Sequence, residues 1–103
     1  MEEKQRLIVY ELSRMKNTYP KRNVFMDCLF LYLLQKEHFK TPGTGSDFDR
    51  ITKNYSMCDI IMFSKIGRVL KEMKAADRVE LLMNVNKELK TDDYRDFIIE
   101  NFS

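Results

Sequence analysis

The chain has 103 residues, of which 44% are hydrophobic and 33% are charged, and its formal net charge is +2. This length suits a single domain with one hydrophobic core, and the composition argues against a chain that is disordered throughout. Only three Gly and two Pro are present and Trp is absent, which argues against a β-sandwich with many turns.

The first predicted element is an amphipathic helix from Glu2 to Lys16. Its apolar residues Ile8, Leu12 and Met15 recur at the spacing of one helical face, and acidic residues occupy its opening turn. Pro20 ends this region because proline has no backbone N–H and disfavours helical backbone at the preceding residue. A short basic turn follows.

The second predicted helix, from Val24 to Phe39, is apolar over most of its circumference, and such a helix is usually central in its domain. A buried strand is the alternative for the run Leu29 to Leu34. We favour a helix because the run is rich in Leu rather than in β-branched residues and is continued by good helix formers. Within it, Asp27 is expected either on a narrow solvent-facing stripe or paired with a base such as Arg6 or Arg14.

A loop from Thr41 to Ser46 separates this helix from a short one that starts at Ser46. Ser46 and Asp49 form a variant of the capping pattern, in which a hydroxyl and an acid three residues later bond free N–H groups. The loop also invites comparison with the glycine-rich phosphate loops of nucleotide hydrolases. Because it lacks their essential lysine and Asp47 would repel a phosphate, we interpret it as a plain connection between helices.

The best helical periodicity lies between Asp59 and Lys74, where apolar residues recur at i, i+4, i+7, i+8 and i+11. Asp77 with Glu80 repeats the capping pattern and predicts the start of the next helix. Thr91 and the two acids after it predict the start of the last one. Together these elements predict an all-α protein, a compact bundle of five or six short helices that forms one helical domain over residues 1–103.

Two further patterns leave the choice between core and interface open. The last helix carries an aromatic stripe of Tyr94, Phe97 and Phe102, which docks either on its own domain or on a partner. Methionine is unusually frequent, with seven residues, and flexible methionine side chains suit both irregular cores and adaptable binding surfaces.

No segment is predicted to be exported or to span a membrane. Glu2 and Glu3 stand where a secretory signal has basic residues, and the longest apolar run, Leu29 to Leu34, is far shorter than the roughly 20 residues of a bilayer span. We therefore expect an intracellular protein, cytoplasmic or nuclear. Its two cysteines, Cys28 and Cys58, lie in apolar stretches and are expected to be free, buried side chains.

The sequence contains no pattern typical of an active site or a cofactor site. The single histidine, His38, has no acidic or cysteine partner at the spacing of a general base pair or a zinc site. Asp92, Asp93 and Asp96 lack the alternating ligands, central Gly and terminal Glu of a calcium loop, and acids that favour a helix start explain them. We therefore predict no enzymatic activity, no cofactor and no metal.

One stretch, from Asp59 to Leu89, combines acidic, apolar and basic residues in a spaced pattern. It begins with the acid Asp59 and the apolar pair Met62-Phe63, and its centre mixes apolar and charged residues. The pattern consists of Asp59, Met62-Phe63, Ile66, Leu70-Lys71-Glu72-Met73, Arg78, Met83, Val85 and Leu89. This pattern, about a third of the chain, resembles the BESS motif, a short helical interaction module of insect chromatin and transcription proteins. Ala75-Ala76 departs from the motif, whose break carries a proline. The resemblance implies self-association, or pairing with a related protein, through Ile66, Leu70, Met73 and Leu82.

We therefore predict a non-enzymatic protein–protein interaction module that binds a second copy of itself or another protein through Ile66, Leu70, Met73 and Leu82. The alternative is a small regulatory nucleic-acid-binding domain with five phosphate-contacting residues: Lys21, Arg22, Arg68, Lys71 and Lys74. A viral or phage effector that binds and inhibits a host protein is a variant of the first prediction, suggested by the small size of the chain.

Overall fold

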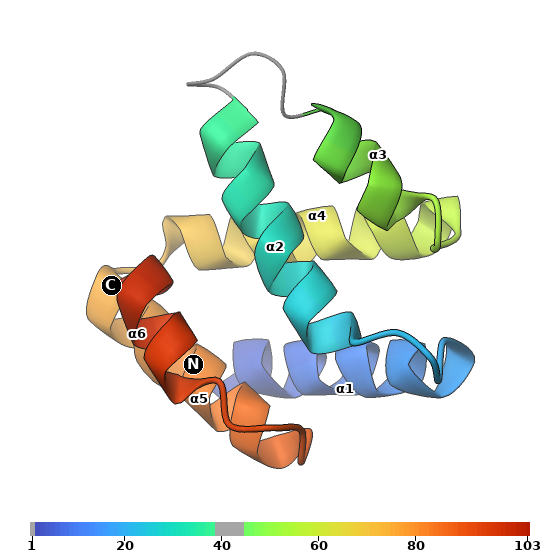
Figure 1. The fold of residues 1–103 in the computed structure, drawn as a ribbon. Coiled ribbons are helices and arrows are strands. Elements are labelled where there is room, and N and C mark those ends of the chain that lie inside the picture. Colours follow the sequence, from blue (N-terminus) through green and yellow to red (C-terminus); the bar gives the residue numbers. More distant parts are fainter. Residues whose placement is uncertain (1, 39–44) are drawn as a thin grey trace.

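The computed structural model describes residues 2–38 and 45–103, and this part of the chain contains six helices and no strand (Figure 1). The helices are α1 (Glu2–Thr18), α2 (Val24–His38), α3 (Gly45–Thr52), α4 (Met57–Glu72), α5 (Ala75–Glu88) and α6 (Arg95–Phe102). The prediction of a compact all-α bundle is confirmed, and the radius of gyration of 13.0 Å is that of a compact chain of this length, about 13 Å.

The helices are arranged around α2. In Figure 1, α2 crosses in front of α4, and the start of α2 reaches α1. Helix α3 packs on α2, while α5 packs on α1 and carries α6 on its other side. The central position predicted for α2 from its apolar circumference is therefore observed, and the run Leu29 to Leu34 is helical rather than extended.

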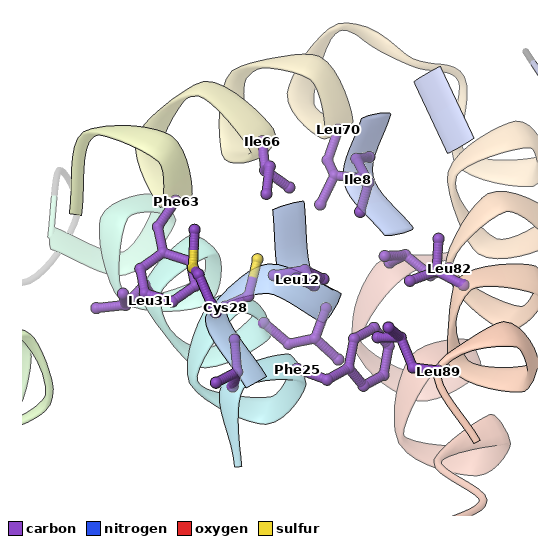
Figure 2. Packing of buried hydrophobic residues seen from close by; sticks show 14 of the residues in the cluster. Ile8, Leu12, Phe25, Cys28, Leu31, Phe63, Ile66, Leu70, Leu82 and Leu89 are labelled. Carbon is purple, nitrogen blue, oxygen red and sulfur yellow. The ribbon is translucent and has the colours of Figure 1, made fainter. Parts of the chain in front are cut away.

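The core lies between α1, α2, α4 and α5, as the converging side chains in Figure 2 show. Ile8, Leu12 and Met15, the predicted inward face of α1, are fully buried. The labelled core residues are Ile8, Leu12, Phe25, Cys28, Leu31, Phe63, Ile66, Leu70, Leu82 and Leu89. Burial of leucine, isoleucine and phenylalanine side chains at about 1.5–3 kcal/mol each is the main force that holds these helices together.

The aromatic stripe of the last helix docks on its own domain. The ring of Phe102 is buried and stacks on Tyr32, with 5.3 Å between the ring centroids. Phe97 meets Phe30 edge to face at 5.6 Å, and Tyr94 lies 6.0 Å from Phe25. Helix α6 therefore packs against α2 as well as α5, although it has only eight residues.

The start of α4 has a serine cap that the sequence analysis did not predict. The helix begins at Met57, and Ser56 is its N-cap: the Ser56 hydroxyl accepts the Asp59 backbone N–H at 3.3 Å and donates to the Asp59 carboxylate at 3.0 Å. The predicted start at Asp59 was therefore wrong by two residues. Ser56-x-x-Asp59 is the capping pattern that the sequence contains and that our prediction overlooked.

Helices α5 and α6 also begin elsewhere than predicted. Helix α5 starts at Ala75 after Lys74, which makes no side-chain cap, so Asp77 lies inside the first turn, where its charge still favours the helix start. Helix α6 starts at Arg95, whose backbone N–H is accepted by the Asp93 carboxylate at 3.0 Å. Of the three residues predicted to open this helix, Asp93 caps its first N–H, whereas Thr91 lies four residues before its start.

The guanidinium of Arg78 joins the ends of two helices. It donates to the carbonyl oxygens of Leu70 at 2.7 Å and Met73 at 2.8 Å, at the end of α4, and to that of Phe102 at 3.3 Å, at the end of α6. Carbonyl groups at helix ends have no partner within their own helix, so this side chain on α5 satisfies groups that would otherwise need water.

The predicted loop from Thr41 to Ser46 falls largely outside the described residues.

Candidate binding surfaces

The four residues predicted to bind a partner lie close together, but inside the protein. Ile66, Leu70 and Leu82 are 2%, 0% and 1% exposed and belong to the core, while Met73 is half-buried against it. The segment that resembles the BESS motif corresponds to α4 and α5. In this fold, contact of these residues with another protein would require α4 and α5 to separate from the other helices.

An exposed apolar surface is instead present on α2. Met26, Phe30, Leu33 and Leu34 follow the spacing i, i+4, i+7 and i+8, which places them on one side of the helix, away from the core residues of α2. We call these four residues the outer face of α2. Phe30 is 41% exposed, whereas Met26, Leu33 and Leu34 are half-buried and pack against the core, so Phe30 is the exposed part of this face.

Other exposed apolar side chains are interrupted by charges. Met57 and Ile61 on α4 are 70% and 49% exposed, but Lys65 and Arg68 continue the same side of the helix at i+4 and i+7 from Ile61. Tyr10 on α1 is 67% exposed, and Arg6 and Arg14 lie four residues before and after it on the same side of the helix. The outer face of α2 differs from these surfaces in having four apolar residues at successive helical spacings.

Asp59 is the centre of a buried polar network at the junction of α1 and α4. Its carboxylate accepts hydrogen bonds from Arg14 at 2.8 Å, from the Tyr19 hydroxyl at 2.7 Å and from Ser56 at 3.0 Å. Burial by itself raises the pKa of Asp59, but the bonds from Tyr19, Arg14 and Ser56 outweigh it and hold the pKa below its usual value. Arg14, considered as a partner of Asp27, is bonded to Asp59 and Glu11 instead.

Asp27 has different partners from those predicted. Its carboxylate accepts a hydrogen bond from the Tyr55 hydroxyl and lies 3.9 Å from the guanidinium of Arg22. Burial of Tyr55 and its bond to Asp27 raise the pKa of the phenol. Asp27 is thus neither on an open solvent stripe nor paired with Arg6 or Arg14, and it helps to hold the basic turn between α1 and α2.

The two cysteines differ in their surroundings. Burial, assisted by the charge of Asp27, raises the pKa of the Cys28 thiol to about 12, so it remains protonated and unreactive at neutral pH. Cys58 is a free thiol as well, but it lies on the surface of α4. The expectation that both thiols are buried was therefore correct for Cys28 and wrong for Cys58.

The five predicted phosphate-contacting residues are all exposed and fall into two groups. Lys21 and Arg22 lie in the turn between α1 and α2, whereas Arg68, Lys71 and Lys74 lie on the second half of α4 and the connection to α5. The Tyr19 hydroxyl accepts the Ser56 N–H, so the first group lies beside the start of α4. At about 1.5 Å per residue, Lys71 is about 18 Å further along the axis than Asp59.

The first basic group borders a hollow of about 370 Å³, formed where the end of α1, the α1–α2 turn and the α5–α6 connection meet. Four basic side chains and one acidic side chain line it: Lys16, Lys21, Arg22, Lys90 and Asp92. The sequence prediction identified two of the four cations. Lys16 and Lys90 were missed because no local pattern indicates that residues so far apart in the chain meet at one place.

Within the described residues, no group of three or more His, Cys, Asp or Glu side chains could hold a metal ion. No helix in the same part of the chain is both long and apolar enough to cross a bilayer. Comparison of the chain with family models, curated proteins and solved structures finds no match.

Proposed function

We propose that this protein is a non-enzymatic interaction module that binds a second copy of itself through the outer face of α2. The observation that carries the proposal is the second apolar side of this helix. The side that includes Phe25 and Leu29 is buried in the core, yet the opposite side is apolar as well, with Phe30 at its centre. Because α2 is central, α3 and α6 cover part of that side, and Phe30, 41% exposed, is the residue that the domain leaves uncovered.

A second copy is the partner that this surface suits best. A two-fold dimer needs one surface that is complementary to itself, and an apolar face meets its own copy through the same residues on both sides. The spacing of the four residues is also that of ridges which interlock when two helices pack. Phe30 and Phe97, whose rings already touch, would supply the aromatic centre of the interface.

The dimer proposal keeps the self-association that the BESS resemblance implies but assigns it to different residues. Ile66, Leu70 and Leu82 stabilise the monomer by packing in its core, and the outer face of α2 is the surface left for a partner. The chemistry of the interface is burial of apolar side chains, which needs no cofactor.

Sedimentation equilibrium over a wide concentration range tests this proposal. We expect the wild type to approach twice the chain mass of 12.4 kDa, and Phe30→Asp to remain at 12.4 kDa. Tyr10→Asp is the matched control, because it places the same charge at an exposed aromatic residue on α1. Circular dichroism and urea unfolding establish that both variants are folded.

Two results would count against the proposal. One is a wild type that stays monomeric at every concentration. The other is equal loss of association in Phe30→Asp and Tyr10→Asp, which would indicate a general effect of added charge rather than an interface at the outer face of α2.

A further inference from the structure

We propose that the hollow between the α1–α2 turn and the α5–α6 connection binds a phosphomonoester. The site is separate from the outer face of α2 and does not depend on self-association. Its basic side chains come from segments about 70 residues apart, since Lys16, Lys21 and Arg22 precede α2 and Lys90 follows α5. Folding therefore brings like charges together in one concave place, an arrangement that favours an anionic ligand.

The walls of the hollow are held by hydrogen bonds within the protein. Asn23 donates to the Tyr94 hydroxyl at 2.6 Å and so joins the α1–α2 turn to the start of α6. The buried Asn86 donates to Thr91 at 2.7 Å and to the Asp92 carbonyl at 2.9 Å, and it accepts the Tyr94 N–H at 2.9 Å. A site whose walls are fixed in advance loses less entropy when a ligand binds.

Two of the four basic side chains are already occupied within the protein. Lys16 donates to the Leu89 carbonyl at 3.2 Å, and Arg22 lies 3.9 Å from Asp27. Lys21 and Lys90, by contrast, have no hydrogen-bond or ion-pair partner among the residues that the structure describes. These two ammonium groups are the ones available to a ligand.

Lys90 has a left-handed backbone conformation, which glycine adopts more easily than lysine does. Its φ of 54° lies in the left-handed region, directly after the C-cap of α5, where glycine is usual because a side chain adds strain. The chain instead carries a lysine at this position, beside the hollow. A charge kept at a strained position is consistent with a role in binding rather than in stability.

The lining of the hollow points to the class of ligand. A phosphomonoester carries close to two negative charges at neutral pH, which matches the two lysines of the lining whose ammonium groups have no partner within the described residues. The volume of about 370 Å³ is in the range of small-ligand sites and leaves room for an organic group beside the phosphate.

Titration followed by NMR of backbone amides tests the site at constant ionic strength. The probes are inorganic phosphate, adenosine 5′-monophosphate and a neutral peptide with one phosphoserine. We expect saturable shifts at residues 20–25 and 89–94, and the tighter of the last two probes identifies the source, a free metabolite or a modified protein. Lys21→Gln and Lys90→Asn should each raise the dissociation constant about two- to fivefold.

Lys65→Gln is the matched control, because it removes an exposed lysine on α4, away from the hollow, and should leave the dissociation constant unchanged. Asparagine tolerates the left-handed backbone, so Lys90→Asn should bind more weakly while unfolding at the same or a higher urea concentration. The proposal is overturned by shifts that do not saturate or by equal effects of Lys21→Gln and Lys65→Gln. It is also overturned if a single-stranded oligonucleotide binds more tightly than all three probes and if replacement of Lys21 and replacement of Lys71 weaken that binding equally.

Discussion

Replacement of Asp59 by asparagine should destabilise the protein markedly, although the two side chains have nearly the same shape. Asp59 is only 4% exposed and accepts side-chain hydrogen bonds from Arg14, Tyr19 and Ser56. Hydrogen bonds to a charged group contribute about 1.5–3 kcal/mol each, against about 0.5–1.5 kcal/mol for neutral pairs. The NH2 group of asparagine would replace one carboxylate oxygen, so at least one of these donors would face another donor and lose its acceptor.

A loss of about 1 kcal/mol for each of three bonds gives about 3 kcal/mol in the free energy of unfolding. Domains of this size have about 5–15 kcal/mol in total, so the melting temperature should fall by at least about 10 °C. Urea unfolding at pH 7, followed by circular dichroism, measures the loss. Glu72→Gln, an exposed position in the last turn of α4, is the control and should change the stability by less than about 0.5 kcal/mol.

The same variant should have a characteristic pH dependence. The pKa of Asp59 is lower in the folded state than in the unfolded state, where it is about 3.9. The stability that its charge contributes is therefore fully present above about pH 4 and is lost as the pH falls through the lower folded value. The difference between wild type and Asp59→Asn should be constant from pH 7 to pH 5 and shrink below about pH 4. A difference under 0.5 kcal/mol at pH 7, or one that does not change on acidification, would refute this reasoning.

Three further predictions concern the core, one backbone position and the thiols. Leu70→Ala should lower the free energy of unfolding by about 2–5 kcal/mol in urea titrations, because Leu70 is fully buried; a smaller loss would place it outside the core. Lys90→Gly should raise the free energy of unfolding by about 0.5–1 kcal/mol through relief of the left-handed strain, and a decrease would disprove that strain. Cys58 should react with a disulfide reagent in the native protein and Cys28 only after unfolding, so rapid reaction of two thiols would contradict the structure.

The helices could be predicted from the sequence because their signals are local. The spacing of Ile8, Leu12 and Met15 marks an inward face, and all three are buried. The starts of helices were harder to predict. Several acidic residues compete for the role of cap, and the Ser56 to Asp59 bond was overlooked because the periodic apolar pattern begins only after it.

The partners of charged side chains could not be predicted in the same way. Arg14 bonds Asp59 rather than Asp27, and these residues meet only because α1 and α4 pack side by side. The same limit applies to Ile66 and Leu70. Periodicity shows that one side of a helix is apolar, but it does not show whether the helix is covered by its own domain or by a partner.

The contacts of Arg78 have a consequence for how the protein opens. An isolated helix as short as α6 is unstable in water and would be expected to fray. Because Arg78 on α5 bonds the carbonyl groups that end both α4 and α6, opening of α6 removes a partner from a charged side chain that is also engaged with α4. The amide hydrogens of α6 should therefore exchange with solvent together with those of α5, as one cooperative unit, rather than earlier as a fraying end.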